Sequence, residues 1–390
     1  MAAVPEKNSI PVWAAVAAGG LCACLPLLMV GSGKVWPPET PAQPAGVDLA
    51  MMLEYSRAWL ETGNPFAGLN PYPPLAAVLF APLAALPFPV AHGLLAALTL
   101  AAFVSVAVAL PLLVFPRADR AAVLLVALAG VFSYGLEFEL RWGQFNVVAL
   151  ACAAWGLYLF HRGRGRWVRA GAYALFSAAI QLKLYPAIFA FLFAQNARAW
   201  RANLARWAML GAANVALLFA LGPQAFADFL ESLKAQAAAP FTWAGNHSIQ
   251  SFAAWAGHPE LAPALFAAFA VCFVSALVRA ARGGGRAEFA GLALMGALGT
   301  MLVPGVSHDY KLVAFPMAFA FFVAAAEPLP LRSDRGMAAA GLFAALGGLF
   351  AWTLFSYAAK PAPLQNNAPF LLAACAALAL RPGAGARREP

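Results

Sequence analysis

Long apolar runs recur along the whole chain and alternate with short polar or basic segments. About 20 consecutive apolar residues span a bilayer core as an α-helix, and shorter stretches are tolerated where helices pack within the protein. By that measure the pattern predicts an all-α polytopic integral membrane protein of about 12 (roughly 11 to 13) transmembrane helices. The first run, residues 12 to 31, is predicted to be an uncleaved helix, because no clear A-x-A site follows it.

The composition agrees with this class. Hydrophobic residues make up 63% of the 390 residues, and the mean hydropathy is +0.74. No soluble fold of this size needs so much apolar surface. The net charge of +9 could suggest a nucleic-acid partner, but the arginines cluster in short loops between apolar runs. Membrane topology explains such clusters better, so no nucleic-acid partner is predicted.

The basic loops fix the predicted orientation, since cytoplasmic loops carry an excess of Lys and Arg. They are residues 161–169, 197–206, 279–286 and 331–335 and the tail from 381. Between the first two lie 27 residues, 170–196, which reach only about 40 Å as one helix. This segment must leave the cytoplasmic side and return to it, so we expect a hairpin of two short helices. Lys183 and Pro186 mark its turn, on or just beneath the outer side.

By the same reasoning, residues 136–146, 222–259 and 303–311 fall outside, so the polar residues that do not set topology gather on one face. One inconsistency remains near the N-terminus. Residues 75–86 and 90–114 both look like membrane segments, and two crossings from an external loop would leave "RADR" (117–120) outside. Either 75–86 does not fully span the membrane, or the helix count is off by one.

The chain is predicted to form one transmembrane domain, residues 1–390, with external loops at 32–74 and 222–259 and a cytoplasmic tail at 381–390. The five cysteines lie inside apolar runs and are predicted to be free thiols, with no disulfide and no metal site. No zincin, P-loop, C-x-x-C or G-x-S-x-G motif occurs, so no cofactor or nucleotide-sugar donor is expected.

Directly after the first apolar run comes a polar stretch, "GVDLAMMLEYSRAWLETGNPF" (46–66). Apolar residues recur at helical spacing from Asp48 to Glu61, which predicts an amphipathic helix at the membrane surface. Its carboxylates could simply be solvated, and Asp48 could simply cap the helix.

Several segments resemble, in order, the polyprenyl-phosphate-mannose-dependent mannosyltransferases of glycosyltransferase family 87, in the GT-C superfamily. They cover about residues 46–320. They are an early Asp followed by "EYSRAWLETGNPFAGLNPYPPLAAVLFAPLAALP", then "RWGQFNVVAL", "AGAYALFSAAIQLKLYP" with "RAWR", "NHSIQSF" and "VSHDYKLVAFP". The last departs from the expected pattern, which is more aromatic around the histidine and often includes a tryptophan.

The resemblance implies a GT-C-like fold and a sugar, mannose by family, moved with inversion from a polyprenyl phosphate to an acceptor hydroxyl at the outer face. A carboxylate must take the acceptor's proton, and Asp48 is the candidate. Cations must stabilise the leaving phosphate, and a lysine between apolar half-helices is usually functional. The candidate donor-phosphate ligands are Lys183, His308 and Arg141. The candidate substrate-binding residues are Tyr72, Gln144, Asn146, Asn246, His247 and Tyr310.

Simpler explanations exist for several of these residues. Lys183 could snorkel to the interface, His308 could be a plain interfacial histidine, and Arg141 could pair with Glu137 and Glu139. At the level of the whole chain, the alternatives are a transporter or flippase of a lipid-linked substrate, and a non-catalytic envelope scaffold. The expected partners of the enzyme are the donor, a lipid or glycan acceptor and membrane lipids, in a bacterial-type inner membrane with the site facing the periplasm.

Overall fold

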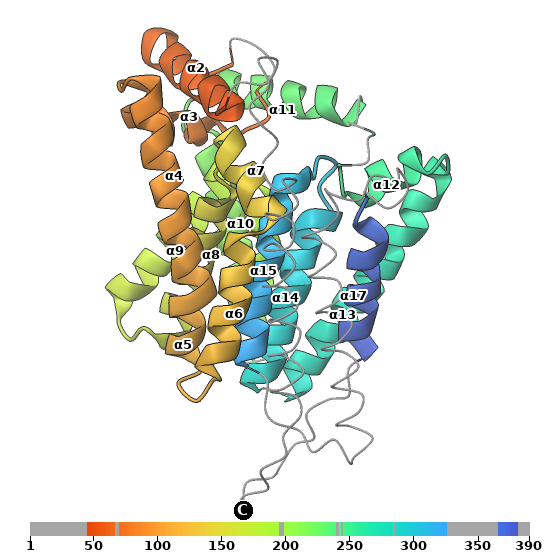
Figure 1. Cartoon of the computed structure of the whole chain (residues 1–390). Helices are drawn as coiled ribbons and strands as arrows, with labels where there is room; N and C mark the ends of the chain where they lie inside the picture. Colours follow the sequence, from red (N-terminus) through yellow and green to blue (C-terminus); the bar gives the residue numbers. More distant parts are fainter. Residues whose placement is uncertain are drawn as a thin grey trace, which may run out of the picture.

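The computed structural model describes residues 45–66, 70–194, 199–238, 242, 245–283, 285–325 and 366–380, which form a bundle of helices (Figure 1). Within these ranges no strand forms, and an isolated bridge joins Asn246 and His308. The all-α fold is therefore confirmed for this part of the chain. The predicted first helix at 12–31, Cys22, Cys24, the basic loop at 331–335 and the tail from 381 lie outside the described residues.

The described helices follow one another along the chain, together with short 3₁₀ and π segments labelled η. In chain order they are α2 (Val47–Thr62), α3 (Pro74–Ala84), α4 (Phe88–Val104), η1 (Ser105–Ala109), α5 (Leu110–Val114), α6 (Arg120–Val131), α7 (Tyr134–Trp142), α8 (Asn146–Arg162), α9 (Arg166–Leu182), η2 (Tyr185–Leu192), α10 (Trp200–Leu218), α11 (Pro223–Ala238), α12 (Ile249–Trp255), η3 (Pro259–Leu261), α13 (Ala262–Gly283), α14 (Arg286–Leu302), η4 (Asp309–Val313), α15 (Ala314–Ala324) and α17 (Ala368–Leu380).

Two helical stretches of the described chain are long and apolar enough to cross a membrane, Phe88–Val114 and Pro259–Arg282. The number rises to four if each of two bent pairs is one span, α6 with α7 at 48° and α10 with α11 at 101°. These apolar spans fit a membrane protein. The described residues do not confirm the predicted number of about 12 transmembrane helices.

Helix α3 accounts for the inconsistency found near the N-terminus. It has only 11 residues, which rise about 17 Å, whereas the hydrocarbon core of a bilayer is about 30 Å thick. A segment of this length is too short to cross a full bilayer core by itself, which favours the first of the two explanations, a segment 75–86 that does not fully span. The next long apolar stretch is then Phe88–Val114.

The two ends of the bundle differ in character. Helices α2, α3, α11 and α12 lie together at one end, at the top of Figure 1, and η4 packs on α7 at the same end. We call this the α2 end. The connections from α5 to α6, from α8 to α9 and from α13 to α14 lie at the opposite end, where Arg162 and Arg286 both reach the last carbonyls of α5. We call this the basic end. The described parts of the segments predicted to be external thus gather at one end.

The hairpin predicted from residue 170 to 196 is present. Helix α9 runs toward the α2 end and stops at Lys183, whose φ of −149° and ψ of 133° are extended. The chain returns as the 3₁₀ segment η2, whose rise of about 2.0 Å per residue carries eight residues further than an α-helix would. The carbonyl of Leu192 then lies 2.9 Å from His161 Nε2, near the end of α8. The return arm therefore reaches the basic end.

Candidate active site

Asp48 lies in the first turn of helix α2, at the α2 end of the bundle. The side chains of Leu49, Met52 and Leu53 are fully buried, and they pack in one apolar cluster with Phe80 and Phe145. This apolar face seats α2 on the bundle as the sequence pattern predicts, and it fixes the first turn of the helix. The membrane-surface position expected for α2 stays a prediction.

The start of α2 is also fixed by a glycine. Gly46 has φ 75°, a left-handed conformation that favours glycine, and its N–H donates to the carbonyl of Arg141 at 2.7 Å. A Cβ at this position would lie 2.7 Å from Phe88 Cζ. The end of α7 and the start of α2 are therefore held together, so Asp48 and the residues that follow Arg141 face each other.

The carboxylate of Asp48 does not cap α2, so that interpretation of the residue is wrong. The helix begins after Gly46, and no side chain caps it. Instead, Asp48 Oδ2 accepts a hydrogen bond of 2.6 Å from Gln144 Nε2. The same Gln144 side chain accepts a hydrogen bond of 2.8 Å from Lys183 Nζ on its Oε1. One amide thus joins the candidate base to the candidate phosphate partner.

Lys183 is 8% exposed and lies against aromatic rings. Its ammonium is 4.4 Å from the ring centroids of Tyr72 and Phe145 and 5.7 Å from that of Tyr310. Ring faces attract a cation and stabilise the protonated lysine. Burial lowers the pKa of Lys183 to about 8, while the carboxylates of Glu139 and Asp48 act in the opposite direction. Near neutral pH the amine is still mostly protonated.

A second carboxylate, that of Glu139, lies next to this group of residues and binds Asn146. Glu139 is fully buried, and it accepts hydrogen bonds from Asn146 Nδ2 at 2.7 Å and from the Val147 N–H at 2.9 Å. The hydroxyl of Tyr185 donates to Asn146 Oδ1 at 3.0 Å. Glu139 therefore binds the first turn of α8, where a negative charge is favourable. The expected pair of Glu139 with Arg141 is not formed, since Arg141 lies 4.0 Å from Glu137 instead.

Replacing Glu139 with glutamine is expected to destabilise the protein by about 1–3 kcal/mol, because a buried amide N–H₂ would then face the donors of Asn146 and Val147. The measurement is thermal unfolding of the purified protein in detergent. Glu137→Gln on the same helix is the matched control, because Glu137 makes only a loose ion pair of 4.0 Å. Equal unfolding midpoints for the two variants would contradict this role of Glu139.

A separate polar cluster lies on the other side of the α2 end. His247 Nε2 is 2.9 Å from Asp309 Oδ1, and the N–H of Asn367 donates to His247 Nδ1 at 3.1 Å. Since Nδ1 accepts, a neutral His247 carries its proton on Nε2 and donates it to Asp309. Tyr134 donates to the other oxygen of Asp309 at 3.3 Å. His247 is fully buried, and with Asp309 it joins four parts of the chain, around Tyr134, His247, Asp309 and Asn367.

Asn246 belongs to this cluster rather than to the group around Lys183. It is fully buried, its amide donates to the carbonyl of Gly305 at 3.0 Å, and its Oδ1 accepts from the Ser307 N–H at 2.8 Å. These bonds hold the loop before α12 against the loop before η4. The substrate-binding roles expected for Asn246 and His247 stay predictions.

His308 and Lys311 lie between the two groups. The His308 ring packs against Tyr310 at 5.7 Å, and burial, followed by the nearby Lys311, lowers the pKa of His308 to about 4. A neutral ring at pH 7 offers one donor and one acceptor but no positive charge. Lys311 Nζ donates to the carbonyl of Val306 at 2.6 Å and lies 4.8 Å from the Tyr185 ring centroid. A second buried lysine thus borders the Asn146 and Tyr185 pair.

Comparison with known proteins assigns the chain to a family. Residues 70–304, more than half of the chain, match the family model of glycosyltransferase family 87. The chain belongs to glycosyltransferase family 87. Membership in the GT-C superfamily is consistent with this. No curated protein and no solved structure matches the chain.

Membership in family 87 makes this protein a glycosyltransferase, which needs a sugar donor and an acceptor, and it does not favour the transporter or scaffold alternatives. The matched range contains Gln144 and Lys183 but ends before His308 and begins after Asp48. The roles of individual side chains therefore depend on their positions. Asp48, Gln144, Asn146, Tyr72, Tyr310 and Lys183 lie together, Arg141 borders this group through its backbone, and Asn246 and His247 lie apart.

Sequence reasoning missed some residues of the site. Glu139 was assigned only to an ion pair, and Phe145 and Tyr185 were not singled out. An acidic residue in an otherwise apolar helical stretch is expensive to bury, so the position of Glu139 was itself a signal of a specific buried partner. For Phe145 and Tyr185 the sequence carries no such signal, because aromatic residues are common in apolar helices.

Proposed function

We propose that this family 87 protein transfers a sugar, mannose by the resemblance of its segments, from a polyprenyl phosphate to an acceptor hydroxyl, with inversion at the anomeric carbon. The observation that carries the proposal is the pairing of a partly buried carboxylate, Asp48, with a buried ammonium, Lys183, through the single amide of Gln144. Such an arrangement offers a base and an anion partner side by side, which is what transfer from a phosphate ester requires.

In the proposed step, Asp48 takes the proton of the acceptor hydroxyl. The oxygen of that hydroxyl attacks the anomeric carbon from the face opposite the phosphate. The new bond between oxygen and carbon forms as the bond to the phosphate oxygen breaks, and the electron pair leaves with the phosphate. The ammonium of Lys183 stabilises the charge that grows there. The proton thus ends on Asp48 and the new negative charge on the phosphate beside Lys183, so the base and the cation must be kept apart.

Gln144 is well suited to keep them apart. An unbridged aspartate and lysine in this space would attract each other, and a direct ion pair would occupy both groups. The amide instead donates to Asp48 at 2.6 Å and accepts from Lys183 at 2.8 Å. Gln144 is 2% exposed, and Asn146 donates to its Oε1 at 3.3 Å, which limits its rotation. Gln144 is therefore proposed as a positioning residue, and its predicted contact with the sugar remains a further proposal.

The proposed location is the outer, periplasmic face of a bacterial-type inner membrane. The arginine-bearing loops lie at the basic end, which the positive-inside rule assigns to the cytoplasm, and Asp48 and Lys183 lie at the α2 end. A polyprenyl-phosphate sugar keeps its head group at the bilayer surface, so the donor can meet the site there without crossing the membrane.

A donor comparison tests the function. Purified protein in proteoliposomes is expected to transfer radiolabelled mannose from polyprenyl-phosphate mannose to extracted bacterial lipids and glycans. Nucleotide-linked mannose should give no product under the same conditions. Transfer from the nucleotide sugar without any polyprenyl phosphate would overturn the proposed donor. Uptake of a lipid-linked substrate into vesicles without sugar transfer would favour a transporter instead.

A further inference from the structure

A large cavity extends from beneath the candidate active site to the basic end. Its volume is about 1100 Å³, slightly above the range of about 300–1000 Å³ usual for ligand sites. Along α8 its lining runs from Leu150, one turn beyond Asn146, to Arg162 at the end of the helix. That distance is about 18 Å of helix. The cavity therefore begins one helical turn below Asn146 of the candidate active site and extends to the opposite end of the bundle.

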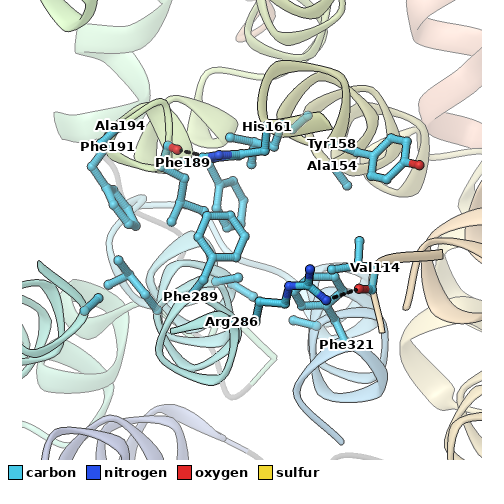
Figure 2. Close-up of a pocket in the computed structure, with 18 of the residues that line it drawn as sticks. Val114, Ala154, Tyr158, His161, Phe189, Phe191, Ala194, Arg286, Phe289 and Phe321 are labelled. Carbon is cyan, nitrogen blue, oxygen red and sulfur yellow. Dashed lines mark hydrogen bonds between the residues drawn. The ribbon is translucent and has the colours of Figure 1, made fainter. Parts of the chain in front are cut away.

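The interior of the cavity is mostly apolar. Figure 2 shows Phe289 and Phe189 projecting into the space, with Phe191 and Phe321 on its sides, and these side chains come from η2, α14 and α15. Leucine, valine and alanine side chains of α5, α8, α10, α13, α14 and α15 also line the cavity, and His161 and Asn203 are polar side chains in its lining. An aliphatic chain is the kind of ligand that such walls accept.

Two arginines stand at the end of the cavity. Arg162 and Arg286 both line it and both are exposed. Arg162 Nη2 lies 3.4 Å from the carbonyl of Leu113. Arg286 Nη1 lies 3.4 Å from the carbonyl of Val114, a contact drawn in Figure 2. The two guanidinium groups, from two different basic loops, thus converge on adjacent carbonyls of one helix end. Each bond is long, and a guanidinium has five N–H donors, so both can also bind a phosphate bidentately.

Amphipathic aromatic side chains border the same region. Trp200 lines the cavity and is 60% exposed, and Tyr158 lies on another side of it (Figure 2). Trp207 also lines the cavity, and its indole Nε1 is buried with no hydrogen-bond partner among the described residues. Such residues are enriched where a membrane meets water. An ester carbonyl is an acceptor that could pair with this indole N–H.

We propose that the cavity binds an anionic phospholipid of the leaflet next to the basic end, with an acyl chain between the phenylalanines and the phosphate between Arg162 and Arg286. Basic pockets between transmembrane helices on the cytoplasmic side bind anionic head groups in this way. The isoprenoid donor does not fit the same position, because its phosphate is proposed to bind at Lys183, at the other end of α8. The inference goes beyond the proposed transfer reaction, and only the exclusion of the isoprenoid donor from this cavity rests on the proposed function.

Native mass spectrometry of the full-length protein, delipidated and titrated with phosphatidylglycerol or phosphatidylcholine, tests the site. Phosphatidylglycerol should bind the wild type more tightly than phosphatidylcholine. Arg162→Gln with Arg286→Gln should weaken phosphatidylglycerol binding about thirtyfold, since each basic residue near a lipid surface contributes about fivefold. Each single exchange should give about fivefold. Ala154→Phe, which fills the cavity and keeps both arginines, should also reduce binding.

The matched control is Arg164→Gln with Arg169→Gln, which removes the same charge from exposed positions outside the described cavity lining. This variant should bind phosphatidylglycerol like the wild type. Equal weakening in the control pair would show a diffuse charge effect and overturn the site. Unchanged binding in the Arg162 and Arg286 single variants would overturn it as well. The site would also be overturned if polyprenyl phosphate displaced phosphatidylglycerol equally strongly from the wild type and from the arginine variants.

Discussion

Asp48→Asn is expected to lower kcat for sugar transfer by about 10²- to 10⁴-fold, the usual contribution of a positioned general base. Asparagine keeps the shape of the side chain, and its oxygen can still accept the hydrogen bond that Gln144 gives at 2.6 Å. It cannot take the proton of the acceptor hydroxyl. The measurement is the initial rate of transfer from polyprenyl-phosphate mannose in proteoliposomes, and KM for the donor should stay near the wild-type value.

The control for this variant lies on the same helix. Glu54 is exposed on α2, and among the described residues it makes no contact with the group around Lys183. Glu54→Gln should therefore transfer sugar at the wild-type rate. A wild-type rate in Asp48→Asn would remove Asp48 from the mechanism. An equal loss in both variants would indicate that α2 tolerates no change of charge, rather than a catalytic carboxylate.

The pH profile gives a second readout for Asp48. Burial raises the pKa of this carboxyl, and the hydrogen bond from Gln144 and the charge of Lys183 lower it by less. A base works only when ionised, so activity should fall as the pH drops through this raised pKa, above the ordinary carboxyl value of about 4. In Asp48→Asn this acidic limb should disappear. The alkaline limb should move to lower pH, because the carboxylate of Asp48 helps to keep Lys183 protonated.

Lys183→Met is expected to lower kcat/KM by about 10²- to 10³-fold, as removal of one preorganised donor at a developing negative charge typically does. Methionine fills the space between Tyr72 and Phe145 but leaves the leaving phosphate without its cation. The measurement is the same transfer assay. Lys234→Met on α11 removes an exposed lysine at the same end of the bundle, and it should leave the rate unchanged.

The alkaline limb of the wild type tests the same group. Lys183 must be protonated to stabilise the phosphate, so activity should fall as the pH rises through its pKa of about 8. Lys183→Arg keeps the charge at all accessible pH values. The arginine variant should lose part of the rate, because the space between the rings is closed, but its alkaline limb should move upward or vanish. An unchanged limb near pH 8 in Lys183→Arg would assign that titration to another group.

Much of the architecture can be predicted from the sequence, because hydropathy acts locally. The apolar runs predict helices, the arginine clusters predict the basic end, and the length of residues 170–196 forces a hairpin whose turn is Lys183. Each conclusion needs only the composition of one segment and the thickness of a bilayer. The resemblance of several segments in family order is confirmed by the match to family 87 over residues 70–304.

The partners of the polar side chains were decided by the tertiary structure alone. Gln144 joins Asp48, 96 residues earlier, to Lys183, 39 residues later. Glu139 binds Asn146 rather than the Arg141 two positions away. A buried polar group must find a partner, but which one it finds depends on how helices from distant parts of the chain approach each other. The sequence by itself therefore determined which residues had to be special, and only the packing of α2, α7, α8 and α9 determined which of them meet.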